Sequence, residues 1–529
     1  MNYHSEIAGF REPMPARQPE TIDRKIEIST ELLSRFADPE VMAGISPDQF
    51  ISGEVPRLSP FDTELLPEGT RLVPLDPALV EFLASESSQD RLDWNTPDSF
   101  LSRYEVSHRE FTPPVDGNSP VMNRLIAEGR VVGFSNLAIE SPTPSKDRHS
   151  RKAIDDTLGE HRIMGMARMP IALGSVPDIG SVLGYMTVAQ SNGMALIARD
   201  KVLSDTDKQV AVVERVIDGL QSMELSDYIM PDTSDLQRFG ELTGIPSETF
   251  DPEVALARYI AELRASWVAN VGAAIETSSK GLDRAKRLRD VGCTLLRIYS
   301  PEGGREIVSQ VAALRDVFDG DPRMKIIAGQ MMDTETALDA QRAGADALII
   351  GVAGGSQCTT SKNAGIPVNT PNLLYRLRGK VNIPIGIEGG GVGDHLMTAY
   401  ALGASFLLKP GEIGMSIEGA GSRYMLRDPD PDGEYWMLYG GEASDASKWW
   451  RDLLDIQGRP KFVEGEPGIR MLPKSQYSMT RNINRLRQQI AIGLVFQRAQ
   501  SIEELHQRDC SNIVEVTSEA AYLSDAYGQ

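Results

Sequence analysis

One cysteine lies in a turn whose composition could support covalent catalysis. The turn reads Gly351-Val-Ala-Gly-Gly-Ser-Gln-Cys358-Thr-Thr360 and follows the apolar run Ala347–Ile350. Glycines leave backbone N–H groups accessible to an anion, and a thiol flanked by hydroxyl groups is a candidate nucleophile. The alternative is that Cys358 is a small buried residue, because free cysteine often packs as a hydrophobic side chain.

Two more glycine turns follow apolar runs further along the chain. Ile383–Ile387 leads into Glu388-Gly-Gly-Gly391, and Phe406–Leu408 leads into Lys409-Pro-Gly411. The carboxyl ends of parallel strands meet at the same edge of a sheet, which is where such α/β folds bind ligands. The three turns therefore predict an anionic ligand at one end of a parallel sheet.

The elements that must position these turns are eight short apolar segments that alternate with helical patterns. Alternation of this kind predicts parallel strands joined by right-handed crossovers. Eight such units predict a closed (β/α)₈ barrel with its chemistry in the loops after the strands, and the alternative is an open doubly wound sheet. The expected strands are Pro170–Leu173, Met194–Ile197, Trp267–Ala274, Leu295–Ile298, Lys325–Ala328, Ala347–Ile350, Ile383–Ile387 and Phe406–Leu408.

The chain divides into three parts, of which the barrel is the second. Residues 1–130 are acidic and proline-rich, which favours an extended arm, with partial disorder as the alternative. Residues 131–517 hold the barrel, with a helix over 205–220 that Asp205 caps, a short helical insert over 221–265 and a flap over 439–475. Residues 518–529 form a C-terminal tail.

Composition excludes several classes of partner. The chain has 529 residues, a formal net charge of −21 and a sequence pI of about 4.9. A surface this acidic repels nucleic acid and anionic membranes, although one phosphate can still bind to local N–H groups. Three cysteines, no apolar run of membrane-spanning length and no leader-like N-terminus lead us to expect a cytoplasmic protein without a disulfide framework.

The order of these turns resembles the inosine monophosphate dehydrogenase and guanosine monophosphate reductase family over roughly Pro170–Thr517. The specific part is the Gly-Ser-x-Cys-Thr-Thr core around Cys358, supported by Glu388-Gly-Gly, Tyr439-Gly-Gly and Glu464-Gly465. The resemblance implies an NAD(P)-dependent oxidoreductase that acts on a purine 5′-monophosphate. It also implies a homotetramer, and many dehydrogenases of the family carry a pair of regulatory modules for which the insert here is too short.

The resemblance assigns roles residue by residue. Cys358 would attack C2 of the purine to form a thioimidate, Thr360 would position water or ammonia, and Glu464 would contact the base. The implied substrate-binding residues are Ser175, Ser356, Glu388, Gly390, Gly391, Gly411, Tyr439 and Gly441. The implied cofactor-binding residues are Tyr299, Gln330 and Gly351, and the backbone carbonyls of Ala353, Gly355 and Cys358 would bind a monovalent cation such as K⁺.

Several positions depart from the family pattern. Tyr299 replaces an aspartate that contacts the nicotinamide ribose, Gln330 replaces an asparagine, and Glu388 replaces the aspartate that holds the ribose hydroxyls. The segment between Tyr439 and Glu464 is short and contains no Arg-Tyr pair. The short segment without an Arg-Tyr pair, together with the short insert, favours NADPH-dependent reduction of guanosine monophosphate. The alternatives are NAD-dependent oxidation of inosine monophosphate and a non-catalytic barrel that binds a purine nucleotide.

Overall fold

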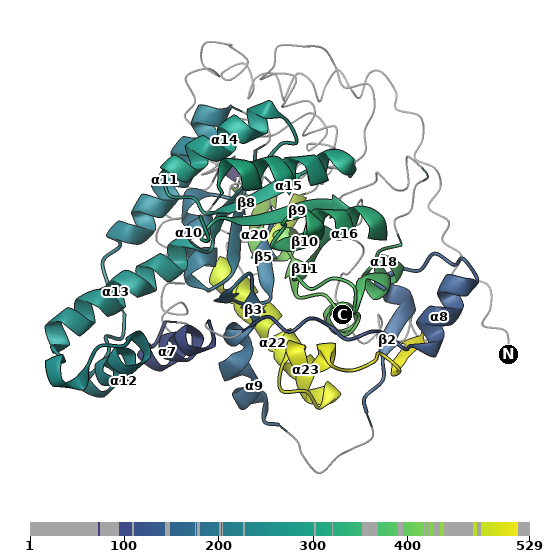
Figure 1. Ribbon diagram of the computed structural model, residues 1–529, viewed down its shortest axis with the longest axis horizontal. Helices are drawn as coiled ribbons and strands as arrows, with labels where there is room; N and C mark the ends of the chain where they lie inside the picture. Colours follow the sequence, from purple (N-terminus) through teal and green to yellow (C-terminus); the bar gives the residue numbers. More distant parts are fainter. Residues whose placement is uncertain are drawn as a thin grey trace.

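The computed structural model places eight parallel strands in a closed barrel (Figure 1). It describes residues 95–107, 110–142, 149–174, 176, 180–199, 203, 205–225, 228–300, 303–319, 321–351, 365, 369–389, 395–416, 418–419 and 478–516, together with the backbone of four strands described below. The strands of the barrel are β5 (Ile171–Leu173), β6 (Met194–Ile197), β7 (Val271–Ile275), β8 (Leu295–Tyr299), β9 (Lys325–Met331), β10 (Ala347–Ile350), β11 (Ile385–Glu388) and β12 (Phe406–Leu408).

The barrel closes where β12 pairs with β5, with Leu407 opposite Ile171. The expected closed (β/α)₈ barrel is therefore confirmed, and the open sheet is excluded. Side chains from alternate positions fill the interior, because successive residues of a strand point to opposite faces. This inner cluster includes Ala172, Met194, Leu196, Leu295, Ile327, Ala347, Ile349, Phe406 and Leu408.

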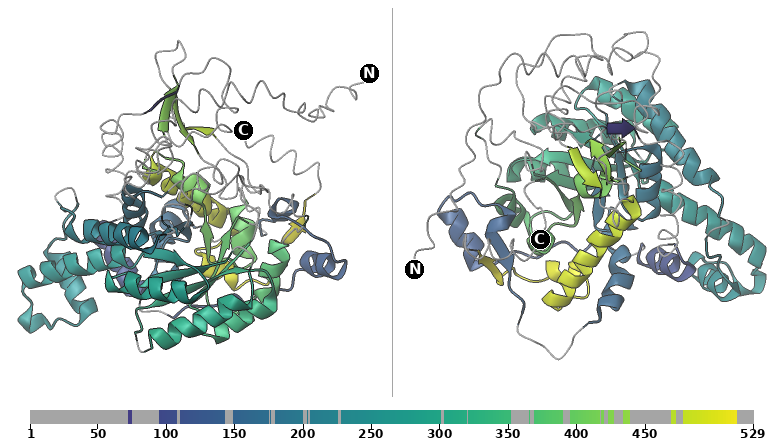
Figure 2. Two further views of the ribbon diagram at one scale, coloured as in Figure 1. Left: turned by 90° about the horizontal axis from the view of Figure 1, so that it is seen from above. Right: turned by 180° about the vertical axis from the view of Figure 1, so that it is seen from behind.

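Helices cover the outside of the barrel, as Figures 1 and 2 show. Helix α11 begins after Asp205, whose carboxylate accepts hydrogen bonds from the N–H groups of Asp207 and Lys208, so the expected cap is confirmed. The helices that follow the strands are α10 (Val182–Gln190), α11 (Thr206–Ser222), α14 (Ser279–Asp290), α15 (Arg305–Val317), α16 (Thr334–Arg342), α18 (Thr370–Leu377), α19 (Leu396–Ala401), α20 (Pro410–Gly414) and α22 (Met479–Gln497).

The insert before β7 is a small helical unit formed by α12 (Thr233–Thr243), η4 (Ser247–Thr249) and α13 (Pro252–Val268). It packs against α7 (Pro97–Val106), with the rings of Phe100 and Tyr259 4.9 Å apart. The expected third strand, Trp267–Ala274, was placed too early, because α13 continues through Val268. Trp267 is buried among helices and donates a hydrogen bond to Asn95 at 3.1 Å.

The amino-terminal end of the barrel is closed by a β-hairpin, β3 (Arg162–Ile163) and β4 (Met166–Ala167), whose Ile163 and Met164 join the inner cluster. A second two-stranded sheet joins β2 (Leu137–Ile139), which precedes the barrel in the sequence, to β16 (Ile513–Glu515), which follows it. The remaining elements are α8 (Pro120–Ala127), η1 (Phe134–Asn136), α9 (Arg151–Thr157), η2 (Leu158–Glu160) and α23 (Ile502–His506).

A separate antiparallel sheet stands off from the barrel (Figure 2). Its order is β1 (Leu72–Pro74), β13 (Arg423–Leu426), β14 (Glu434–Leu438) and β15 (Ile469–Leu472). The first strand comes from the acidic N-terminal part, so that part contributes a strand to the region after β12. Within the described residues, no helix is both long and apolar enough to cross a bilayer.

Candidate active site

The loops after the barrel strands hold the expected site, but only five of its residues are described. These are Glu388, Gly411, Tyr299, Gln330 and Gly351. The other expected site residues lie outside the described residues: Ser175, Ala353, Gly355, Ser356, Cys358, Thr360, Gly390, Gly391, Tyr439, Gly441 and Glu464.

A buried ion pair crosses the mouth of the barrel. Arg297 on β8 and Glu388 at the end of β11 meet side to side, and Arg297 Nη1 donates to Glu388 Oε1 at 3.0 Å. Arg297 Nη2 donates to Oε2 of the same carboxylate. The Arg297 side chain is fully buried and that of Glu388 is 14% exposed. A bidentate pair of this kind fixes the plane of the carboxylate as well as its position.

Gln330 joins this pair from the next strand. Its Nε2 donates to Glu388 Oε2 at 3.0 Å. Residues on β8, β9 and β11 therefore converge on one carboxylate at the end of the barrel where the loops containing the expected site begin. The side-chain period of two explains the convergence, because Arg297 lies on the same face of β8 as the inward-pointing Leu295.

Tyr299 ends the same strand and lies beside two arginines. The guanidinium carbon of Arg297 is 4.8 Å from the centre of the Tyr299 ring, and that of Arg199 is 5.6 Å from it. Arg199 also donates to the backbone carbonyl of Tyr299 at 3.1 Å. Cation–π contacts at these distances are attractive. The position that holds an aspartate in the family pattern thus presents an aromatic ring in a positively charged setting.

Glycines allow the backbone to approach this cluster closely. Gly174 directly follows β5, and a Cβ atom there would lie 2.8 Å from Glu388 Oε1. Gly351 directly follows β10 with φ of 101°, a conformation that favours glycine. Gly351 therefore lets the backbone change direction directly after β10.

Gly411 lies in the first turn of α20, directly after β12. The first N–H groups of a helix have no partner within the helix, so this turn suits the phosphate contact expected for Gly411. Lys409 precedes it, is 6% exposed and forms an ion pair with Glu412 at 2.5 Å.

Sequence reasoning missed Arg297 and Arg199. A single arginine inside the apolar run Leu295–Ile298 was the signal for the first, since a charge on a barrel strand must meet a partner. Nothing in the spacing of Arg199 distinguishes it from a surface residue. Among the described residues, no group of histidine, cysteine, aspartate and glutamate could hold a metal ion.

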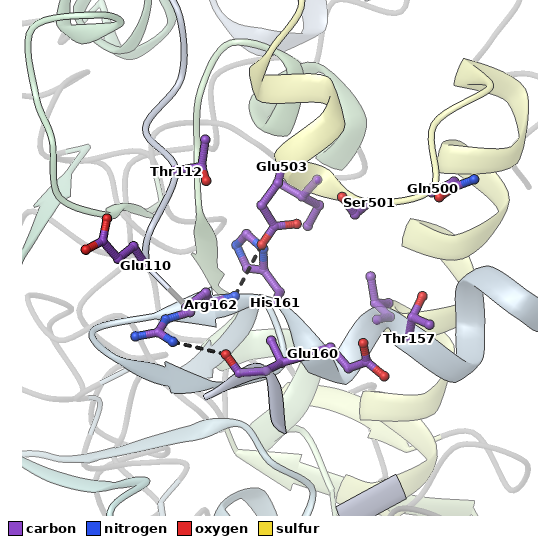
Figure 3. Close-up of a pocket in the computed structure, with 12 residues that line it drawn as sticks. Glu110, Thr112, Thr157, Glu160, His161, Arg162, Gln500, Ser501 and Glu503 are labelled. Atoms are coloured by element: carbon purple, nitrogen blue, oxygen red, sulfur yellow. Dashed lines mark hydrogen bonds and ion pairs between the residues drawn. The ribbon is translucent and has the colours of Figure 1, made fainter. Parts of the chain in front are cut away.

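Figure 3 shows a pocket of about 260 Å³. It lies near the amino end of β12, because His161 on its wall bonds to Ser405. His161 and Glu503 form an ion pair on its wall, and His161 also donates from Nε2 to the carbonyl of Ser405, just before β12. Arg162 and Glu110 line the same pocket. None of the five expected site residues that the structure describes lines this pocket.

The match to known sequences decides the family. Residues 180–526, more than half of the chain, match the model of the IMP dehydrogenase / GMP reductase domain. The chain belongs to this family. The match begins just before α10 and extends beyond the last described strand, so it covers seven strands of the barrel and every glycine turn described above.

Curated relatives are similar over shorter stretches. Inosine-5′-monophosphate dehydrogenase of Tritrichomonas foetus is 32% identical over 209 residues, which cover 37% of this chain and 40% of that protein. The enzyme of the same name from Toxoplasma gondii is 29% identical over 159 residues, 29% of this chain and 28% of its own. The Aquifex aeolicus enzyme is 25% identical over 244 residues, 45% and 48% of the two chains. The alignments thus span less than two thirds of each relative.

Proposed function

We propose that this chain is an NAD(P)-dependent oxidoreductase that acts on a purine 5′-monophosphate through Cys358. The observation that carries the proposal is the Gly-Ser-x-Cys-Thr-Thr sequence, which begins directly after β10 in a barrel of the IMP dehydrogenase / GMP reductase family. Loops in this position carry the chemistry of (β/α)₈ enzymes.

Cys358 would act as a nucleophile at C2 of the purine. In the reductive direction its sulfur bonds to C2 of guanosine monophosphate and ammonia leaves, which forms a thioimidate. A hydride then enters at C2 and the thiolate leaves, giving inosine monophosphate. Glu464 would supply the proton that departing ammonia requires, and Thr360 would hold the ammonia in place.

The residues around Tyr299 fit a nicotinamide cofactor. Tyr299 is the last residue of β8, Gln330 is the second-last of β9 and Gly351 directly follows β10. These strands are neighbours, so the three residues can contact one flat ligand. Tyr299 contributes an aromatic ring that contacts Arg297 and Arg199. Gln330 can accept a hydrogen bond at Oε1 while its Nε2 is held by Glu388. When bound, the nicotinamide supplies the hydride or accepts it.

Two short segments, the insert between α11 and β7 and the stretch from Tyr439 to Glu464, favour the reductive direction. Only the helical unit α12–α13 stands between α11 and β7, and the segment from Tyr439 to Glu464 contains no Arg-Tyr pair to activate water. The printed names of the relatives favour the other direction, since each is an inosine-5′-monophosphate dehydrogenase. Oxidation of inosine monophosphate by NAD⁺, with potassium as a candidate activator, is therefore the second candidate. Assembly into a tetramer is part of the same proposal.

Two matched reactions followed by nicotinamide absorbance test this proposal. The first combines the full chain with guanosine monophosphate and NADPH, and the second with inosine monophosphate, NAD⁺ and potassium. We expect oxidation of NADPH in the first reaction and its loss in Cys358→Ala. Formation of NADH in the second alone would assign the dehydrogenase direction. Silence in both, with nucleotide still bound, would favour a non-catalytic nucleotide-binding barrel.

A further inference from the structure

The hydrogen bonds around Glu388 limit what this carboxylate can offer a substrate. A carboxylate has two oxygens and about four lone-pair positions in total. Among the described residues, three are taken by N–H donors, two from Arg297 and one from Gln330. Oε2 receives two of these donors, and Oε1 receives one.

Moving either Arg297 or Gln330 away from the Glu388 carboxylate would cost free energy. Arg297 is fully buried, so separating it from Glu388 would break a bidentate ion pair in a low-dielectric interior. Its ring contact with Tyr299 holds it from a second side. Gln330 is 8% exposed and would need another partner for its amide.

The backbone also restricts the approach to Oε1. Gly174 comes so close that even a methyl group at its Cβ position would lie 2.8 Å from this oxygen. With only the donors of the described residues counted, one acceptor position remains on the carboxylate, on Oε1, which lies beside Gly174 at the end of β5. A diol that binds both carboxylate oxygens would have to displace Gln330 or Arg297.

We infer that Glu388 binds one hydroxyl of the substrate sugar, not two, and that Arg297 and Gln330 set this limit. The inference rests on the proposed function, because it takes the ligand at the mouth to be a purine 5′-monophosphate. It makes Arg297 and Gln330 positioning residues for sugar recognition. The substrates that fit are purine nucleotides of which only one sugar hydroxyl, at 2′ or at 3′, is needed for binding. The site therefore accepts either the 2′-deoxy or the 3′-deoxy nucleotide, but not both.

Calorimetric titration of the full chain with matched nucleotides tests this inference. The ligands are guanosine monophosphate, inosine monophosphate and the 2′-deoxy and 3′-deoxy forms of each. We expect one deoxy form to bind within about threefold of the ribonucleotide. The other should bind at least tenfold more weakly, because a carboxylate built to accept a hydroxyl is left without it.

Gln330→Ala provides a second readout. Removing this amide leaves a position on Oε2 open to a hydrogen bond from the second sugar hydroxyl. The variant should therefore bind both hydroxyls. The deoxy form that the wild-type chain tolerates should then bind at least threefold more weakly than the ribonucleotide. Gln507→Ala is the matched control, since Gln507 is an exposed residue that donates to the carbonyl of Pro113 far from the mouth. This control should keep the wild-type preference.

The outcomes separate the inference from the function on which it rests. If both deoxy forms lose tenfold or more with the wild-type chain, the single-hydroxyl inference is wrong and the proposed function stands. If both bind like the ribonucleotide, Glu388 does not read the sugar and the inference is also wrong. If no purine monophosphate binds, the proposed function fails and the inference fails with it. An unchanged preference in Gln330→Ala contradicts the role given to Gln330.

Discussion

At the scale of single residues, the Arg297–Glu388 pair is the feature that most distinguishes this barrel mouth. Buried pairs of this kind add little net stability compared with apolar side chains of the same size, but removing one partner is costly. The pair is therefore better understood as a device that orients the Glu388 carboxylate than as a source of stability.

Glu388→Ala should destabilise the protein by about 3–5 kcal/mol, because it leaves a fully buried guanidinium without its carboxylate. Urea denaturation followed by tryptophan fluorescence measures this change. The double variant Arg297→Met/Glu388→Leu should recover most of the loss. Glu335→Ala is the control, since the Arg305–Glu335 pair is about three-quarters exposed and should contribute little. A Glu388→Ala variant as stable as the control would contradict this account.

Gly174→Ala should weaken nucleotide binding roughly tenfold, or about 1.4 kcal/mol. The added methyl group would lie 2.8 Å from Glu388 Oε1 and 3.4 Å from a side-chain atom of Pro410, so the carboxylate must shift. Titration calorimetry with a purine monophosphate measures the effect. Gly133→Ala is a matched control, because a methyl group there meets its nearest neighbour at 3.6 Å. Equal affinities for the two variants would show that the carboxylate is not held against this backbone.

At the scale of elements, α23 is tied to the barrel by a buried acid–base cluster. Glu503 pairs with His161, and His506 bonds from Nε2 to the carbonyl of Ala404 at 3.0 Å. Burial, and then the positive charges of His161 and Arg378, lower the pKa of His506 to about 3. Burial acts to raise the pKa of Glu503, but the charge and hydrogen bond of His161 outweigh it and leave that pKa well below its usual range.

These shifts predict loss of stability in acid. The unfolded chain protonates His506 near pH 6.5 and the folded chain only near pH 3, so the folded state binds fewer protons between these values. Stability should therefore be full above about pH 6.5 and fall by up to about 1.4 kcal/mol per pH unit below it. Glu503 adds a further loss once the pH falls below about 4.5.

Denaturation at pH 7 and pH 5 tests the histidine contribution. The wild-type chain should lose about 2 kcal/mol between these values from His506 alone. His506→Gln should show a smaller loss, since glutamine does not titrate. The same difference in both proteins would mean that His506 is not buried in its neutral form.

Several elements of the fold could be predicted from the sequence alone. The runs Met194–Ile197, Ala347–Ile350 and Phe406–Leu408 coincide with β6, β10 and β12, because short apolar runs between helices have few other interpretations. The run that begins at Trp267 was misassigned, because an apolar pair at the end of a helix looks like the start of a strand. The partner of Glu388 could not be found, since it depends on the register between strands.

At the scale of the whole molecule, the two cysteines that the structure describes, Cys293 and Cys510, are both buried. Burial raises the pKa of Cys293 to about 12 and that of Cys510 to about 11, and both are free. Thiolate is the reactive form, so these two should resist alkylation at neutral pH. Cys358 follows β10 in the sequence and lies outside the described residues.

Alkylation of the native chain with iodoacetamide at pH 7.5 should therefore add one group per chain, at Cys358. Intact-protein mass spectrometry measures the number, and peptide mapping gives the position. Cys358→Ala should gain none in the same interval, while the unfolded wild-type chain should gain three. Modification of Cys293 or Cys510 in the native chain would contradict the burial described for them.

The central claim is that Cys358 mediates hydride transfer at C2 of a purine nucleotide, and deuterium tracing tests it most directly. The full chain is incubated with guanosine monophosphate and NADPH that carries deuterium at the transferable position of the nicotinamide. The account predicts inosine monophosphate with one deuterium at C2, and none from Cys358→Ala. Unlabelled product, or equal labelling from both proteins, would contradict it.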